Sequence, residues 1–144
     1  MGGQRVHRPV IAPATAADAA AVVALWHRCG LTRPWNDPHA DFARALEGGS
    51  SEILVARDGD VIGSVMVGHD GHRGWLYYLA VAPERRGQGI GSALFAAAEH
   101  WLRRAGVPKV QLMVRSDNHA AMDFYAAQGL DRQDVAVFGR FLTG

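Results

Sequence analysis

Apolar side chains in the first third of the chain recur every three or four positions within two segments. Residues 16–29 place Ala, Val, Leu and Trp side chains on one face of a helix. Thr15 is a candidate N-cap for this helix, with Asp18 three positions later as in a partial capping box. A second helix is predicted over residues 39–47, after Asp37 as its N-cap.

Shorter apolar runs, bounded by turn residues, indicate strands. We expect strands at residues 6–12, 52–57, 61–69 and 75–82. Pro9 has no N–H to donate, so the first strand is expected at a sheet edge. Gly- and Asp-containing turns join the last three strands, which predicts that they run antiparallel in succession.

In the second half of the chain, segments with helical spacing alternate with short apolar runs typical of strands. This pattern predicts a helix over 90–105, a strand over 110–114, a helix over 119–128 and a final pair of strands near 131–133 and 135–142. The resulting fold class is α/β, of the mixed α+β kind, with an antiparallel front half and one crossover unit.

The composition limits the classes of function that the chain can have. The 144 residues are 49% hydrophobic, which suits one domain over residues 6–144 behind a flexible N-terminus of residues 1–5. The net charge of +1 argues against nucleic acid as a partner. The single cysteine, Cys29, fits the reducing cytoplasm. The chain shows no apolar run of membrane-spanning length, no signal-peptide pattern and no metal-ligand spacing, so neither a membrane nor a metal is expected.

Candidate chemistry concentrates in residues 79–92. An apolar strand runs into a loop that contains Gly87, Gly89 and Gly91, and a helix follows at once. Glycines there let backbone N–H groups approach a ligand, and the first amides of the helix have no internal partner. The junction therefore predicts an anion site for a diphosphate.

Two nucleotide-binding patterns fit less well. The chain has no Gly-Lys pair and hence no P-loop. The dinucleotide pattern has Ser92 in place of its third glycine, and Lys109 and Val110 stand where an acidic residue belongs. Arg115 after the next strand could suit a 2′-phosphate, so NADP remains the alternative at this point, although only one βαβ unit is visible.

Two motifs resemble those of the GNAT acetyltransferases. Arg86-x-x-Gly89-x-Gly91 resembles the acetyl-CoA signature of that family, and residues 118–130 are similar to its second signature, N-x-x-A-x-x-[FL]-Y-x-x-x-G-[FLY]. The resemblance implies the GNAT fold: a largely antiparallel sheet flanked by helices, in which strands 75–82 and 110–114 splay apart around coenzyme A. It also implies transfer of an acetyl group from acetyl-CoA to a primary amine, by direct attack in a ternary complex. A non-catalytic acyl-CoA-binding module is the alternative.

The resemblance also implies roles for individual residues. The residues expected to bind the coenzyme are Leu79, Ala80, Val81, Arg86, Gly87, Gln88, Gly89, Ile90, Gly91, Ser92, Asn118 and Tyr125. A backbone amide at Leu79 would stabilise the developing charge on the carbonyl oxygen, next to a bulge near Tyr78–Leu79. Tyr125 would protonate the departing thiolate. Asn118 would contact the coenzyme or simply cap its helix.

The general base and the acceptor site are less defined. The segment 75–79 has no carboxylate, and strand alternation would place Tyr78 on the same face as Leu76. Asp37, Asp70 and His72 are the candidate bases, each also suited to a cap or a turn. A water chain to solvent is the alternative, since the amine needs only to lose a proton.

The acceptor is expected to be a small amine, an amino-acid-like compound or a peptide N-terminus. The residues predicted to contact it are Arg33, Trp35, Asn36, Asp37, Asp70 and Tyr78. The loop 31–38 and the turn 70–74 resemble the YpeA-like branch of the family. A homodimer through the last strands is possible, as in other GNAT proteins.

Overall fold

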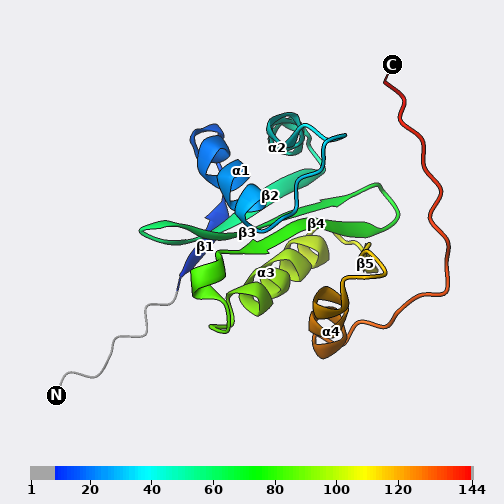
Figure 1. The fold of residues 1–144 in the computed structure, drawn as a ribbon. Coiled ribbons are helices and arrows are strands. Elements are labelled where there is room, and N and C mark those ends of the chain that lie inside the picture. Colours follow the sequence, from blue (N-terminus) through cyan, green and yellow to red (C-terminus); the bar gives the residue numbers. More distant parts are fainter. Residues whose placement is uncertain (1–8, 144) are drawn as a thin grey trace. The chain divides into compact units, whose positions relative to one another are not determined.

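The computed structural model describes residues 9–143, which form a five-stranded sheet and four α-helices (Figure 1). In chain order the elements are β1 (Val10–Pro13), the 3₁₀ turn η1 (Ala16–Asp18), α1 (Ala19–Arg28), α2 (Pro38–Glu47), β2 (Ser51–Asp58), β3 (Asp60–His69), β4 (Gly74–Val81), the 3₁₀ turn η2 (Pro83–Arg85), α3 (Ile90–Arg104), β5 (Val110–Leu112) and α4 (His119–Ala127). The expected flexible segment 1–5 and the start of the expected strand 6–12 lie outside the described residues.

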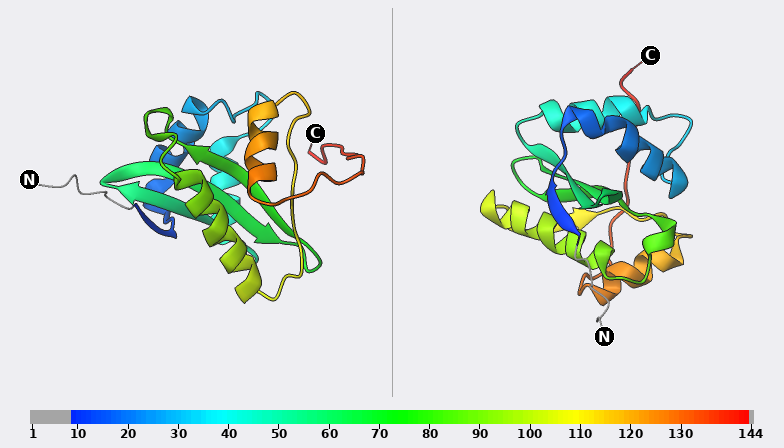
Figure 2. Two further views of the ribbon diagram at one scale, coloured as in Figure 1. Left: turned by 90° about the horizontal axis from the view of Figure 1, so that it is seen from below. Right: turned by 90° about the vertical axis from the view of Figure 1, so that its left-hand side faces the viewer.

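The strands lie in the order β1-β2-β3-β4-β5. β1 to β4 pair antiparallel and β4 pairs parallel with β5, which confirms the mixed sheet with one crossover. β1 is an edge strand, as Pro9 predicted. The chain divides into two compact units, residues 1–113 and 114–144. In the first unit, α1 and α2 cover one face of the sheet and α3 covers the other (Figures 1 and 2).

Two glycines allow α3 to pack directly on the sheet. A Cβ added to Gly74 would lie 2.6 Å from the Leu102 side chain, and one added to Gly63 would lie 2.8 Å from Leu94. Leu94 and Phe95 of α3 are in turn fully enclosed by the core. This packing fixes the axis of α3 and therefore the position of its N-terminus, which the loop after β4 leads into.

The start of the first helix is tied to the sheet by a buried carboxylate. Thr15 donates its backbone N–H to Oδ2 of Asp18 over 2.8 Å, which is half of the predicted capping box. The other carboxylate oxygen of Asp18 lies 2.5 Å from the guanidinium of Arg57 on β2. The hydrogen bond from Arg57, then that from Thr15, lowers the pKa of Asp18 below its ordinary value of 3.8.

The predicted final pair of strands is wrong. Among the described residues no strand follows β5, and residues 131–143 are exposed and without regular structure. Val135 is 72% exposed and Phe138 is 95% exposed. An extended segment is held as a strand only when its N–H and C=O groups pair with a neighbour, and alternation of apolar residues does not supply that neighbour.

We predict that Asp18→Asn lowers the free energy of unfolding by about 1–2 kcal/mol at pH 7, because the bond to Arg57 loses its negative partner. Since the folded pKa of Asp18 is depressed, its contribution is complete above pH 3.8 and is lost as the pH falls below that value. Urea unfolding of both proteins at pH 7 and pH 3 checks this. An equal difference at the two pH values would contradict it.

Candidate active site

β4 carries a bulge at the position predicted from the sequence. Met66 of β3 pairs with Tyr77 and Ser64 pairs with Ala80, so Tyr78 and Leu79 together face one residue of β3. Tyr78 has φ of 54°, and it is the one non-glycine residue in 9–143 with a positive φ. A backbone in this region is strained for an L-residue, and such strain gathers at functional sites. The predicted bulge near Tyr78–Leu79 is therefore confirmed.

Contacts from both helices on one sheet face hold Tyr78 in this conformation. Its ring stacks on Trp26 of α1, with the ring centroids 3.9 Å apart and the planes within 11°. Its hydroxyl donates to Oδ2 of Asp41 on α2 over 2.7 Å. The indole of Trp26 donates to the buried hydroxyl of Ser64 over 3.0 Å.

The bulge also changes which face Tyr78 occupies. Leu76 pairs with Val67, which lies on the α3 face because Ser64, three residues earlier, contacts α1. Tyr78 contacts α1 and α2 instead. The expectation that Tyr78 shares a face with Leu76 is wrong, since an extra residue with a positive φ interrupts the alternation.

The Tyr78 hydroxyl keeps its proton over a wide range of pH. Burial raises its pKa first, and the hydrogen bond to Asp41 and the negative charge of that carboxylate raise it further. Tyr78 is consequently a neutral phenol at working pH, with its proton directed at Asp41 and its oxygen lone pairs able to accept.

β4 and β5 separate just before the bulge. Their parallel pairing covers Gly74, Trp75 and Leu76 and ends there. Residues 77–81 consequently have no partner strand on the β5 side among the described residues. This is the expected divergence of the two central strands, and Leu79, Ala80 and Val81 lie along its edge.

The loop between β4 and α3 exposes a row of backbone donors. Gly87 and Gly89 have φ of 80° and 79°, and Gly89 is the N-cap of α3. Within residues 9–143, the backbone N–H groups of 87–91 donate no hydrogen bond. Free amides at a helix N-terminus suit an anionic ligand, and the absence of side chains at the glycines leaves room for it.

Of the two arginines in this loop, one is bound to neighbouring side chains and the other is exposed. Arg85 is bound to Oδ2 of Asp58 and to Oε1 of Gln88, each over 3.0 Å. This ties the loop to the end of β2. Arg86 is exposed, so it is the arginine of the pair whose charge faces solvent.

The second sequence motif forms α4, in the second compact unit. Asn118 accepts a hydrogen bond from the backbone N–H of Ala121 over 3.1 Å and is the N-cap of the helix, as one of its two interpretations predicted. The ring of Tyr125 contacts Phe124 edge-on, with centroids 5.1 Å apart. Burial raises the pKa of Tyr125 to about 12, so its hydroxyl is protonated at neutral pH.

The residues of the expected acceptor loop bind mainly to their own backbone. Arg33 donates to the carbonyls of Gly30 and Thr32 over 2.8 and 2.9 Å. Asp37 accepts from His39 and Ala40 as the N-cap of α2. Trp35 and Asn36 are exposed.

Asp70 lies in the turn before β4, at the end of that strand away from the bulge. It accepts from the N–H groups of His72 and Arg73 and from the indole of Trp75. These bonds, with Arg73 first, lower the pKa of Asp70 to about 2. His72 lies in the same exposed turn. The structure thus does not bring Asp70 and His72 to the bulge.

Asp41 and Trp26, by contrast, reach the bulge and were missed by the sequence reasoning. Asp41 is the carboxylate bound to Tyr78, yet in the sequence it is one more charge on a predicted amphipathic helix. Trp26 was assigned only to a helix core. A search for acidic residues one turn after the N-cap Asp37 would have found Asp41, but nothing local pairs it with β4.

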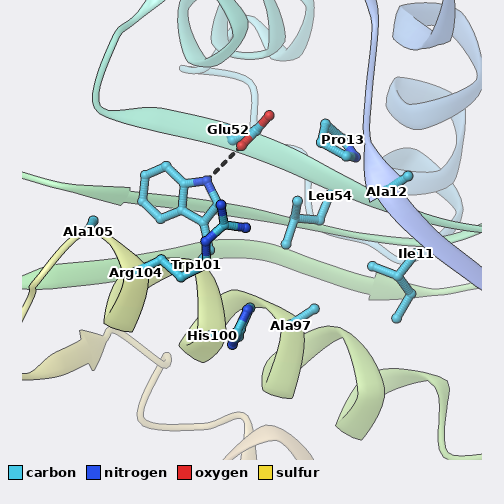
Figure 3. Close-up of a pocket in the computed structure, with 10 residues that line it drawn as sticks. All are labelled: Ile11, Ala12, Pro13, Glu52, Leu54, Ala97, His100, Trp101, Arg104 and Ala105. Carbon is cyan, nitrogen blue, oxygen red and sulfur yellow. Dashed lines mark hydrogen bonds between the residues drawn. The ribbon is translucent and has the colours of Figure 1, made fainter.

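A pocket of about 500 Å³ lies elsewhere, between β1–β2 and the second half of α3 (Figure 3). Its lining residues are Ile11, Ala12, Pro13, Glu52, Leu54, Ala97, His100, Trp101, Arg104 and Ala105. The indole of Trp101 donates to Glu52 over 2.6 Å across its wall. None of the residues predicted to bind coenzyme or acceptor lines this pocket.

Comparison with known proteins decides the family. Residues 16–130 match the acetyltransferase (GNAT) family. The chain belongs to this family. The acetyltransferase is 46% identical over 126 residues to acetyltransferase ECA0875 of Pectobacterium atrosepticum, covering 87% of this chain and 89% of that protein. It is equally similar, over 127 residues, to acetyltransferase SG1711 of Sodalis glossinidius, with the same coverage.

Solved structures agree on the fold. The aminoglycoside N-acetyltransferase AAC(6')-Iy in complex with CoA matches the acetyltransferase with a TM-score of 0.83 at 18% identity, over 98% of this chain and 99% of that one. A ribosomal-protein-alanine N-acetyltransferase from Brucella melitensis matches with a TM-score of 0.75 at 22% identity, over 92% and 99%. The GNAT fold excludes the dinucleotide-binding alternative, which requires several parallel βαβ units. No helix within residues 9–143 has the length and apolar character to cross a membrane.

The three tyrosines, Tyr77, Tyr78 and Tyr125, should ionise late. Burial is the first cause of a raised pKa in each, so the native acetyltransferase should show less phenolate absorbance near pH 10.5 than the urea-unfolded chain. Asp41→Asn removes a negative charge that opposes phenolate formation, and should lower the pKa of Tyr78 while burial keeps it above 10. Spectrophotometric titration measures both effects. A native curve that coincides with the unfolded one would contradict them.

Proposed function

We propose that this acetyltransferase transfers the acetyl group of acetyl-CoA to the nitrogen of a primary amine, by direct attack in a ternary complex. The observation that carries the proposal is the strained bulge at Tyr78–Leu79, followed within ten residues by the row of free amides at 87–91. One site offers an anchor for an anionic coenzyme and a donor beside a reacting carbonyl. The solved relatives named as N-acetyltransferases support the same reaction class.

The loop has the donor set that a diphosphate requires. Backbone amides of Arg86 to Ser92 would hold the phosphate oxygens, with the positive end of the α3 dipole behind them. The edge of β4 along Leu79, Ala80 and Val81, which has no partner strand on the β5 side, would receive the rest of acetyl-CoA. Asn118 would contribute from the second motif.

Acetyl-CoA supplies the acetyl group as a thioester, and the chain supplies donors and a proton. The backbone N–H of Leu79 would stabilise the carbonyl oxygen as charge grows on it, which is often the largest contribution to such a reaction. Tyr125 would protonate the departing sulfur. With its pKa at about 12, this phenol is fully protonated at pH 7 and ready to donate.

The acceptor would be a small amine, an amino-acid-like compound or a peptide N-terminus. Arg33, Trp35, Asn36 and Asp37 would form its outer boundary, because the polar loop 31–38 leads into α2, which contacts Tyr78. The sequence of this loop and of the turn 70–74 supports placement in the YpeA-like branch of the family.

The proposal also covers the domain organisation, the oligomeric state and the cellular compartment. Residues 6–144 would act as one catalytic domain, since residues 16–130 match a single family of acetyltransferases. A homodimer is supported by the exposed apolar side chains of residues 135–142. A reducing, cytoplasmic setting is supported by the lone cysteine, Cys29.

We expect acetyl-CoA to bind the wild-type protein and to release thiol when an amine panel is supplied. The panel would hold putrescine, lysine methyl ester and a hexapeptide beginning with alanine. Gly89→Glu should abolish both activities, because a side chain is strained at φ 79° and a carboxylate would repel the diphosphate. Gly106→Glu, at a similar φ after α3, is the matched control. Calorimetry showing normal acetyl-CoA affinity in Gly89→Glu would overturn the loop assignment, and tight binding with no turnover would favour a binding module.

Tyr125→Phe should reduce kcat about 100-fold, the scale of a lost general acid, while leaving the acetyl-CoA dissociation constant within about twofold, well under the ~1.4 kcal/mol of a tenfold change. The ring packing against Phe124 is retained in this variant, and thermal unfolding checks that the fold is kept. Steady-state kinetics and calorimetry on the same preparation separate the two quantities. Unchanged turnover would remove the assignment of Tyr125 as the acid.

A further inference from the structure

We propose that Tyr78 and Asp41 form the subsite for the acceptor amine, in which the Tyr78 hydroxyl oxygen takes a proton from the amine while Asp41 takes the hydroxyl's own proton. The proposal rests on the N-acetyltransferase function proposed above and identifies a proton acceptor for it. It replaces the candidate bases Asp37, Asp70 and His72 with a pair that the sequence did not reveal.

The backbone of β4 links this pair to the proposed reacting centre. Tyr78 directly precedes Leu79, whose amide is the proposed donor to the carbonyl oxygen. Its hydroxyl lies 2.7 Å from Oδ2 of Asp41, a residue 37 positions away in the sequence. The stack on Trp26 fixes the ring plane, and the bond from Trp26 to Ser64 fixes the indole. The hydroxyl is therefore held in position by three separate elements, β4, α1 and α2.

The other carboxylates considered have their oxygens engaged differently. Asp37 accepts two backbone N–H groups as a helix cap, and Asp70 accepts three donors at the far end of β4. Asp41 accepts one hydrogen bond from the hydroxyl of Tyr78 and a longer one, 3.3 Å, from the exposed Arg44. It is half-exposed, so a proton that arrives on it can pass to solvent.

Tyr78 must work as a relay and not as a phenolate. Its raised pKa means that the hydroxyl does not lose its proton alone at working pH. A phenol can nevertheless accept a proton on its oxygen as it gives up the original one. Asp41, bonded to that proton, is positioned to receive it in the same step.

The protons balance over one turnover. An ammonium acceptor gives one proton through Tyr78 to Asp41, and from there to solvent, which leaves a neutral amine. The nitrogen then forms the C–N bond as the C–S bond breaks, and it loses a second proton by the same route. The sulfur gains a proton from Tyr125, which solvent replaces. The net products are the amide, the free thiol of coenzyme A and one released proton.

The test compares Asp41→Asn, Tyr78→Phe and the double variant on whichever panel amine turns over. Asn preserves an oxygen that accepts from Tyr78 but cannot take its proton, and Phe preserves the stack on Trp26. Each single variant should lower kcat/KM for the amine about 100-fold, within the range of general base catalysis. The double variant should lose no more than either single one, because both changes break the same path. Glu47→Gln, an exposed carboxylate on the same helix, is the control and should behave as wild type.

Three further measurements distinguish this role from a structural one. Acetyl-CoA calorimetry should be unchanged in Asp41→Asn, and its thermal unfolding should stay cooperative with a midpoint lowered by only a few degrees, because the hydrogen bond to Tyr78 becomes neutral. Calorimetric binding of the same amine to the enzyme–CoA complex, by contrast, should weaken at least threefold. Unchanged kcat/KM in Asp41→Asn, additive losses in the double variant, or an equal loss of acetyl-CoA affinity would each overturn the relay. If the wild type binds acetyl-CoA and acetylates no amine of the panel, the proposed function itself fails and the relay fails with it.

Discussion

The backbone of Tyr78 is the constraint on which the site depends. A positive φ costs a non-glycine residue roughly 1–3 kcal/mol, and here it lies where β4 has one residue more than β3 can pair. The stack on Trp26 and the bond to Asp41 are of a size to offset that cost, since aromatic pairs contribute about 0.5–1.5 kcal/mol beyond burial and hydrogen bonds to charged groups about 1.5–3 kcal/mol. Without the bulge, β4 would continue its alternation and Tyr78 would face α3.

The same bulge explains how one strand serves two partners. Up to Leu76, β4 is a central strand with hydrogen-bonded neighbours on both sides, β3 and β5. Beyond Leu76 it keeps β3 only. Its backbone then has no strand partner on the β5 side over residues 77–81, although the carbonyl of Val81 accepts a hydrogen bond from the thiol of Cys29 over 3.3 Å. The glycine loop begins a few residues later. Gly63 and Gly74 let α3 pack close to the sheet, because a Cβ at either position would meet leucine side chains of that helix. The free amides at 87–91 lie at the N-terminus of this closely packed helix.

Much of this could be predicted from the sequence, and the exceptions have identifiable physical causes. Helices, strands and caps followed from local signals such as Asp37 before Pro38, or the turn at 58–60. The glycine loop and Asn118 followed from motifs, which are local too. The contacts of Tyr78 with Trp26 and Asp41 join residues 52 and 37 positions apart, and no local pattern encodes such pairs. The strands predicted at 131–133 and 135–142 do not form for a related reason: their apolar alternation is local, but a strand requires a neighbouring strand to pair with.

The two faces of the sheet carry separate halves of the site. The proposed coenzyme loop is supported by the Arg85–Asp58 bond at the end of β2 and leads into α3, which covers one face of the sheet (Figure 1). Tyr78 is held by Trp26 of α1 and Asp41 of α2, the helices on the other face. Substitutions in the two N-terminal helices can therefore alter the acceptor side without passing through a residue that supports the coenzyme loop. Because of this division, evolution or protein engineering could change which amine is recognised without changing the proposed binding of the coenzyme.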